Sequence, residues 1–115
     1  MKDNIVVIKS RTFAIRIIRL YQYLLSEKKE YILSKQLLRS GTSIGANIKE
    51  AIQGQSKKDF IAKMQISLKE ASETEYWLDL LHETEYLDKA QFSSINTDCV
   101  ELIKLLTSII KQSKE

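Results

Sequence analysis

The residues of this sequence best suited to acid–base or metal chemistry are the carboxylates and the one histidine of its second half. His82 follows Asp79 by three residues, a spacing that puts both side chains on one side of a helix. A carboxylate-bridged di-metal site in a helical bundle needs two Glu-x-x-His pairs, and this sequence has 1 histidine. We therefore expect no metal centre and no cofactor.

An acidic cluster runs through the same region and consists of Glu70, Glu73, Glu75, Asp79, Glu83 and Glu85. Paired carboxylates can act as general acid and base. A solvated helix face is the more common role of such a run, and Glu73 and Glu75 could also meet basic residues of another helix. The sequence has no Gly-rich phosphate loop, cysteine cluster or recognisable Ser/His/Asp set. These observations favour a protein that is not an enzyme and takes no small-molecule substrate.

A stripe of polar residues is more informative, because its members fall at spacings of four, four and three and therefore align on one side of a helix. The stripe consists of Arg39, Ser43, Asn47 and Glu50. We favour a hydrogen-bonded network that fixes helix register or a subunit contact, and the alternative is a set of ligand contacts.

Basic residues are concentrated in the first part of the chain. Residues 1–69 carry 14 Lys and Arg against 5 Asp and Glu, whereas residues 70–115 carry 4 against 10. The basic part could bind a phosphate backbone by counterion release, or it could pair with the acidic part within or between subunits. We expect the candidate nucleic-acid-binding residues to cluster around the second predicted helix and the start of the third. They are Arg16, Arg19, Lys35, Arg39, Lys49, Lys57, Lys58 and Lys63. No recognition-helix or sheet-based RNA motif is present, so readout of base sequence is not indicated.

The elements that must position these residues are all helices. The sequence has no proline and 3 glycines, which disfavours a β-rich fold, and apolar residues recur at helical spacing. We predict helices over residues 10–26, 32–54, 56–84 and 89–113, with Ser10 or Thr12 capping the first and Ser56 the third. Short links make successive helices antiparallel neighbours. The prediction is an all-α, antiparallel up-down-up-down four-helix bundle in which residues 1–115 form one domain.

The first predicted helix is apolar on more than one side. Between Phe13 and Leu25 its polar residues form a single narrow stripe. A monomeric bundle buries one face of each helix, so the remaining apolar surface around Ile15, Ile18 and Tyr23 predicts a subunit interface. We therefore expect a homo-oligomer. Residues 4–8, which precede this helix, are predicted to form an ordered arm.

Three further features concern packing and location. Gly41 and Gly45 lie four residues apart on one helix face, which predicts close approach of a neighbouring helix. Cys99 lies among apolar helix positions and is expected to pack as a small hydrophobe.

The apolar run at the N-terminus is too short for a signal peptide or a membrane span, so we expect a cytoplasmic protein without a membrane partner.

The motif that begins at Gln36, Q-L-L-R-S-G-T-S-I-G-A-N-I-K-E-A, followed by S-K-K-D-F from Ser56, is similar to a known bacterial family. The chain resembles the four-helix bundle proteins encoded within intervening sequences of 23S ribosomal RNA genes, over nearly its whole length. The family commonly has Asn-Ile-Ala-Glu-Gly where this chain has Asn-Ile-Lys-Glu-Ala at residues 47–51, and often a first-loop proline that is absent here.

This resemblance implies a homo-oligomer, a pentamer in the family's pattern, with a basic surface and an association with RNA. Related accessory proteins of diversity-generating retroelements share the fold and engage nucleic acid and a reverse transcriptase. The resemblance brings no catalytic residue and does not make the chain a component of the ribosome.

Two functions follow as hypotheses. The first is a non-catalytic bundle that binds structured RNA or other nucleic acid through a basic surface. The second is a protein-interaction scaffold, for example an accessory subunit to a reverse transcriptase, with no direct nucleic-acid role.

Overall fold

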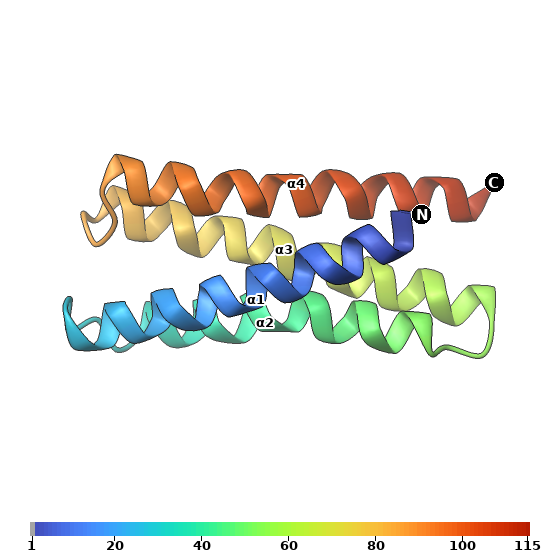
Figure 1. Cartoon of the computed structure of the whole chain (residues 1–115), viewed down its shortest axis with the longest axis horizontal. Coiled ribbons are helices and arrows are strands. Elements are labelled where there is room, and N and C mark those ends of the chain that lie inside the picture. The colour runs from blue at the N-terminus through green and yellow to red at the C-terminus, as the bar shows by residue number, and fades with distance from the viewer. Residues whose placement is uncertain (1) are drawn as a thin grey trace.

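Four long helices follow one another in the computed structural model, which describes residues 2–115 and, from residue 5 onward, their side chains. The helices are α1 (Lys2–Ser26), α2 (Leu33–Ile52), α3 (Lys57–Glu83) and α4 (Lys89–Lys114). Each runs antiparallel to its neighbour in sequence, and together they form a rod of 44 × 20 × 19 Å with both chain ends at the same end of the rod (Figure 1). The prediction of an all-α, up-down-up-down bundle is confirmed.

The helices pack around a square. α2 lies against α1 and α3, and α4 lies against α3 and α1, whereas the diagonal pairs do not touch through their backbones in the described residues. The α1–α4 contact is the smallest of the four, because α1 crosses the bundle at an angle and only its N-terminal half approaches α4 (Figure 1). The α1–α4 boundary is therefore the most loosely packed of the four in the described residues.

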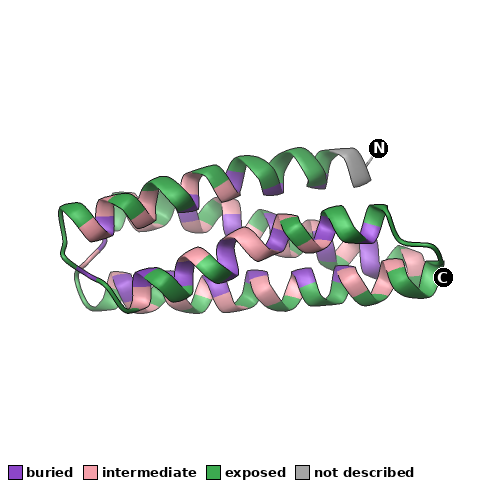
Figure 2. Cartoon of the chain, turned by 90° about the horizontal axis from the view of Figure 1, so that it is seen from below, coloured by how far each residue is buried: buried purple, intermediate pink, exposed green. Residues whose placement is uncertain are grey.

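The core follows the predicted helical spacing. Buried residues form a stripe along the inward face of each helix, and exposed residues cover the outside (Figure 2). Small and polar residues occupy the middle of the α3 stripe, where Ser67 Oγ donates to the Ile44 carbonyl at 2.8 Å and Thr74 Oγ1 to Ser40 Oγ at 2.9 Å. The fully buried large side chains are Phe13, Ile17, Leu24, Leu37, Ile44, Ile48, Met64, Leu78, Leu81, Leu87, Leu102 and Leu106.

The start of α1 differs from the prediction. Neither Ser10 nor Thr12 caps the helix, and residues 5–8 form helical turns rather than an arm. The apolar spacing continues toward the N-terminus through Val6, which is buried, and Ser10 is 1% exposed with its hydroxyl donating to the Val7 carbonyl at 3.1 Å. Burial of this extra turn therefore outweighs the preference of serine for a helix start.

The other helix ends depend on local hydrogen bonds. Ser56 Oγ accepts from the Asp59 amide at 3.1 Å and caps α3, as predicted. Asp88 and Gln91 form a reciprocal capping box at the start of α4. α2 ends at Ile52, two residues before the predicted boundary, because Gln53 and Gly54 bond back to the carbonyls of Lys49 and Ala51 as a turn.

Candidate nucleic-acid interface and neighbouring surfaces

Three of the eight candidate nucleic-acid-binding residues are engaged inside the fold. Arg16 on α1 donates to the Asp98 carboxylate at 2.6 Å and to the Ser94 hydroxyl at 2.8 Å, so it joins α1 to α4. Arg39 on α2 pairs with two carboxylates of α3, and Lys63 on α3 pairs with Glu50 on α2 at 3.1 Å. A phosphate would have to compete with a carboxylate at each of these positions.

The polar stripe of α2 lies along the α3 side of the helix. Arg39 reaches Glu70 at 3.1 Å and also bonds to Glu73. Ser43 Oγ donates to the Arg39 carbonyl at 2.6 Å, and Asn47 Nδ2 donates to the Ser43 carbonyl at 2.8 Å. The stripe thus makes contacts within α2 and to α3 at both ends. Exposed ion pairs of this kind each add only about 0–1 kcal/mol to stability.

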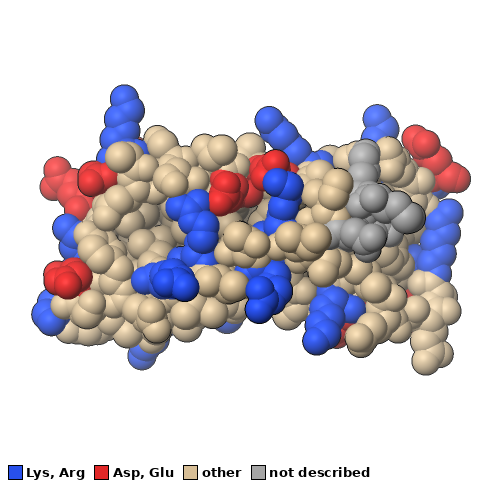
Figure 3. Space-filling model, in the orientation of Figure 1, with Lys and Arg blue, Asp and Glu red and all other residues tan. Residues whose placement is uncertain are grey.

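The remaining candidates are exposed and face solvent. Within residues 5–115 no carboxylate lies within ion-pair distance of them. They are Arg19 on α1, Lys35 and Lys49 on α2, and Lys57 and Lys58 at the start of α3. Figure 3 shows Lys and Arg side chains over the middle of the α1 face. The acidic side chains visible in this middle region lie on the side nearer α4.

The structure does not bring the eight residues into one compact patch, contrary to the prediction that they cluster. Lys35 lies in the first turn of α2, and Lys57 and Lys58 follow its far end. Because α2 has 20 residues at 1.5 Å each, about 30 Å of helix separates the two ends. The five unpaired candidates are instead spread over the length of the rod, on α1, α2 and the start of α3, and we call this set the cation band.

Arg11 belongs to this band and was missed by the sequence analysis. It is exposed on α1 and has no ion pair among the described residues. It lines a groove between α1 and α2, to which Lys49 contributes from α2. The sequence signal for Arg11 was its position four residues before Ile15, which is itself three residues before Ile18. This spacing places all three side chains on the same outward face of α1. The misplaced start of α1 hid this relation, because Arg11 then stood at a helix end.

The outward face of α1 carries exposed apolar residues. Ile15 is 36% exposed and Ile18 is 41% exposed, and Ile8, which the sequence analysis placed in an arm, is 65% exposed. Tyr23, the third predicted interface residue, is instead half-buried and packs against the core. The reason is geometric, because five residues turn a helix by about 500° and so place Tyr23 about 140° away from Ile18.

The acidic cluster does not converge on one point. Glu70 and Glu73 pair with Arg39, whereas Glu75 and Asp79 line a separate depression between α3 and α4. In the part of the chain that the structure describes, no three His, Cys, Asp or Glu side chains are arranged to hold a metal ion. His82 stacks on Phe92 with ring centroids 4.5 Å apart, so its ring packs between α3 and α4.

Cys99 is buried on α4, and its Sγ approaches the Ala71 carbonyl at 3.4 Å, in agreement with its predicted role as a small core residue. Burial, with a smaller contribution from the negative charge of Glu75, raises the pKa of the thiol to about 12. The thiol is therefore neutral at physiological pH, and its nucleophilic thiolate form is strongly disfavoured.

Among residues 2–115, no helix has both the length and the apolar character that crossing a membrane requires.

Comparison with known proteins adds two observations. The model of the 23S rRNA-intervening sequence protein family matches residues 2–108. A crystal structure of a protein of unknown function from the S23 ribosomal protein family of Bacteroides thetaiotaomicron VPI-5482 has 62% identity to this chain and a TM-score of 0.95, over 96% of this chain and 99% of that one. No curated protein matches.

Proposed function

Because the chain belongs to the 23S rRNA-intervening sequence protein family, we propose that it is a non-catalytic cytoplasmic protein that binds structured RNA through phosphate contacts. The observation that carries this proposal is the band of six exposed cations without a carboxylate partner in the described residues. The band consists of Arg11, Arg19, Lys35, Lys49, Lys57 and Lys58.

The charge of the two helices that carry most of the band supports the same function. α1 and α2 together contain 8 Lys and Arg against 2 Asp and Glu. Arginine and lysine that lack a partner in the fold can neutralise phosphates without first breaking an ion pair. Each such contact releases condensed counterions from the nucleic acid, and this release drives binding at low salt.

The elongated arrangement also suits an extended polyanion. A band along a rod of 44 Å can follow a helical RNA backbone, whereas a small anion would meet only one or two of the cations. Recognition of this kind reads the shape and the phosphates of the RNA and not its base sequence.

The test is the affinity for a structured 23S rRNA fragment, measured by fluorescence anisotropy at several salt concentrations. About four phosphate contacts should give a slope of log affinity against log salt near −3 to −4. The double variant Lys57→Glu, Lys58→Glu should weaken binding and reduce the slope by about 2, because two contacts are lost.

The matched control is Lys104→Glu, which reverses an exposed lysine on α4, outside the band. A slope near zero for the wild-type protein would refute phosphate binding. Equal losses in the double variant and in the control would show a general charge effect without a binding band.

A second function, a protein-interaction scaffold, rests on a different observation, which is the exposed apolar face of α1 around Ile8, Ile15 and Ile18. Apolar residues gathered on one face stabilise a complex when another chain covers them. We propose that this face joins subunits into a homo-oligomer, a pentamer in the family's pattern. The alternative occupant is a different protein, such as a reverse transcriptase that the bundle assists.

A further inference from the structure

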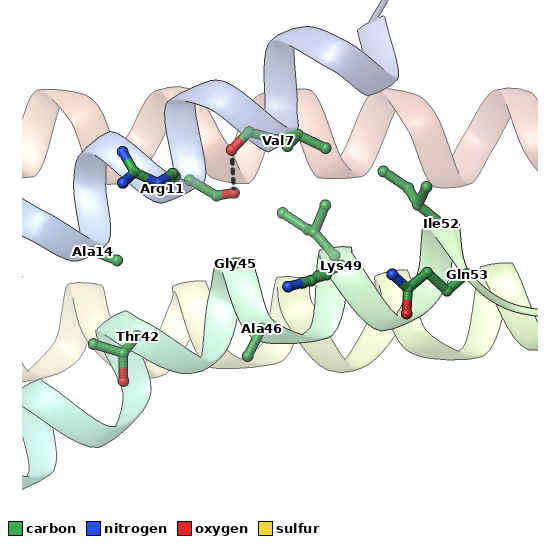
Figure 4. Close-up of a pocket in the computed structure, with 11 residues that line it drawn as sticks. Val7, Arg11, Ala14, Thr42, Gly45, Ala46, Lys49, Ile52 and Gln53 are labelled. Carbon is green, nitrogen blue, oxygen red and sulfur yellow. Dashed lines mark hydrogen bonds between the residues drawn. The ribbon is translucent and has the colours of Figure 1, made fainter.

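A groove of about 600 Å³ lies between α1 and α2, around Gly45. It opens where the N-terminal half of α1 diverges from α2, and Figure 4 shows its side chains projecting from both helices. Small residues line the floor and rim of the groove. Ser10, Ala14 and Gly45 are at least partly buried, and Ala46 is exposed. Small side chains leave room for the side chains of a third helix to enter between the two.

The floor has no free hydrogen-bond donor among its hydroxyls. Ser10 donates to the Val7 carbonyl at 3.1 Å, and Thr42 donates to the Leu38 carbonyl at 2.7 Å. Val7 and Ile52, at one end of the groove, are 37% and 47% exposed. The interior of the groove therefore favours apolar groups over phosphates or sugars.

The walls of the groove are cationic. Arg11 stands on the α1 wall and Lys49 on the α2 wall (Figure 4), and no carboxylate lines the groove. Elsewhere the bundle pairs its cations across helix boundaries, as in Lys9–Glu101, Arg16–Asp98 and Lys63–Glu50. The α1–α2 boundary is therefore a place where the fold leaves two opposed positive charges uncompensated around an apolar floor.

We propose that this groove binds an acidic amphipathic helix of a partner protein. Such a helix presents an apolar row to the floor and carboxylates on both sides of the row, where they reach Arg11 and Lys49. The lining extends on α2 from Thr42 to Gln53, which is about 16 Å of helix, so the bound segment has about three turns. The site shares Arg11 and Lys49 with the band proposed to bind RNA, but its apolar floor plays no part in phosphate contacts.

The experiment uses a fluorescent synthetic peptide of about twelve residues, matched to three helical turns, with leucines at helical spacing and glutamates on both flanks. The control peptide has the same leucines and replaces every glutamate with lysine. The acidic peptide should bind the wild-type protein, and the lysine peptide should bind at least about tenfold more weakly, a difference of one charge contact or more.

Two variants locate the site. Ala46→Trp fills the groove at an exposed position and removes no charge, so it should abolish peptide binding and leave RNA affinity and helicity unchanged. The pair Arg11→Glu, Lys49→Glu should weaken the acidic peptide about tenfold or more. Lys104→Glu, outside the groove, should leave its affinity within about twofold, the effect of a remote surface charge.

Absence of peptide binding, or equal binding of the acidic and lysine peptides, would overturn the proposal. If Ala46→Trp dissociates an oligomer in light scattering, the groove is a contact between copies of this chain and the proposal is wrong. If the same variant removes RNA binding, the groove belongs to the RNA surface, and the proposal is again wrong. A protein that binds the peptide but not RNA would support the groove and refute only the proposed RNA function.

Discussion

At the scale of single residues, the two helical glycines of α2 lie in different environments, although the sequence predicted close approach of a neighbouring helix at both. A Cβ added at Gly41 would lie 2.8 Å from both Cγ atoms of Ile17, which is fully buried and branched at Cβ. A Cβ at Gly45 would lie 3.3 Å from Ser10 Oγ, a hydroxyl beside the open groove. Close approach of α1 therefore requires glycine at residue 41 more strictly than at residue 45.

We expect Gly41→Ala to lower the free energy of unfolding by about 1–3 kcal/mol, because Ile17 has no room to move within the core. Gly45→Ala should leave it within about 1 kcal/mol of the wild-type value, since the gain in helix propensity offsets a mild contact with Ser10. Urea denaturation of the two variants measures the difference. Equal losses in the free energy of unfolding would show that α1 packs equally tightly against both glycines.

At the scale of elements, the start of α2 depends on Glu30, a residue that no sequence pattern singled out. Glu30 is 8% exposed, and its carboxylate accepts hydrogen bonds from the amides of Ile32, Leu33 and Ser34 at 2.8–3.3 Å. Ser34 Oγ donates in return to the Glu30 carbonyl at 2.8 Å. A carboxylate in this position satisfies amides that have no partner in the helix and interacts favourably with the helix dipole.

Glu30→Ala should lower the free energy of unfolding by about 1–2 kcal/mol, as removal of a helix cap does elsewhere. Glu30→Gln keeps an acceptor oxygen and should lose less. The matched control is Glu27→Ala, which removes an exposed carboxylate from the same connection. Thermal unfolding followed by circular dichroism ranks the three variants, and a Glu27→Ala loss as large as that of Glu30→Ala would refute the capping role.

At the scale of the whole molecule, the outward face of α1 determines whether the bundle assembles. Ile15 and Ile18 contribute little to the core of one chain, since each is more than a third exposed. In an oligomer the same side chains would leave water when the neighbouring subunit covers them.

Ile15→Glu and Ile18→Glu should each lower the mass seen by size exclusion with light scattering, while the helical signal in circular dichroism stays near the wild-type value. A charge placed in an apolar interface is desolvated without a partner, which disfavours assembly. Ile66→Glu on α3, where the isoleucine is 43% exposed, is the matched control and should keep the wild-type mass. If the two α1 variants also keep it, α1 is not the subunit interface.

Helix type, number and order could be predicted from the sequence, because the 3.6-residue spacing of apolar residues is a local property. The seam of α4 shows this. Ile95, Cys99, Leu102, Leu106 and Ile109 recur at spacings of four and three and are all buried, whereas Phe92, which begins the same series, is partly buried. The start of α1 was predicted wrongly because Ser10 and Thr12 resemble caps, and only contact with the other helices buries Val6 and the serine itself.

The candidate site depended more on tertiary structure. Residue types and spacing identified a basic surface, but ion pairs to Asp98, Glu70, Glu73 and Glu50 engage Arg16, Arg39 and Lys63, and these partners lie 13 to 82 residues away in the sequence. The groove beside Arg11 and Lys49 also arises only in the fold, from the angle at which α1 crosses α2. The sequence by itself determined which faces are apolar and which are charged, since helical periodicity sets them. The tertiary structure decided which charges are neutralised and where a hollow forms, because both depend on distances between helices that are remote in the chain.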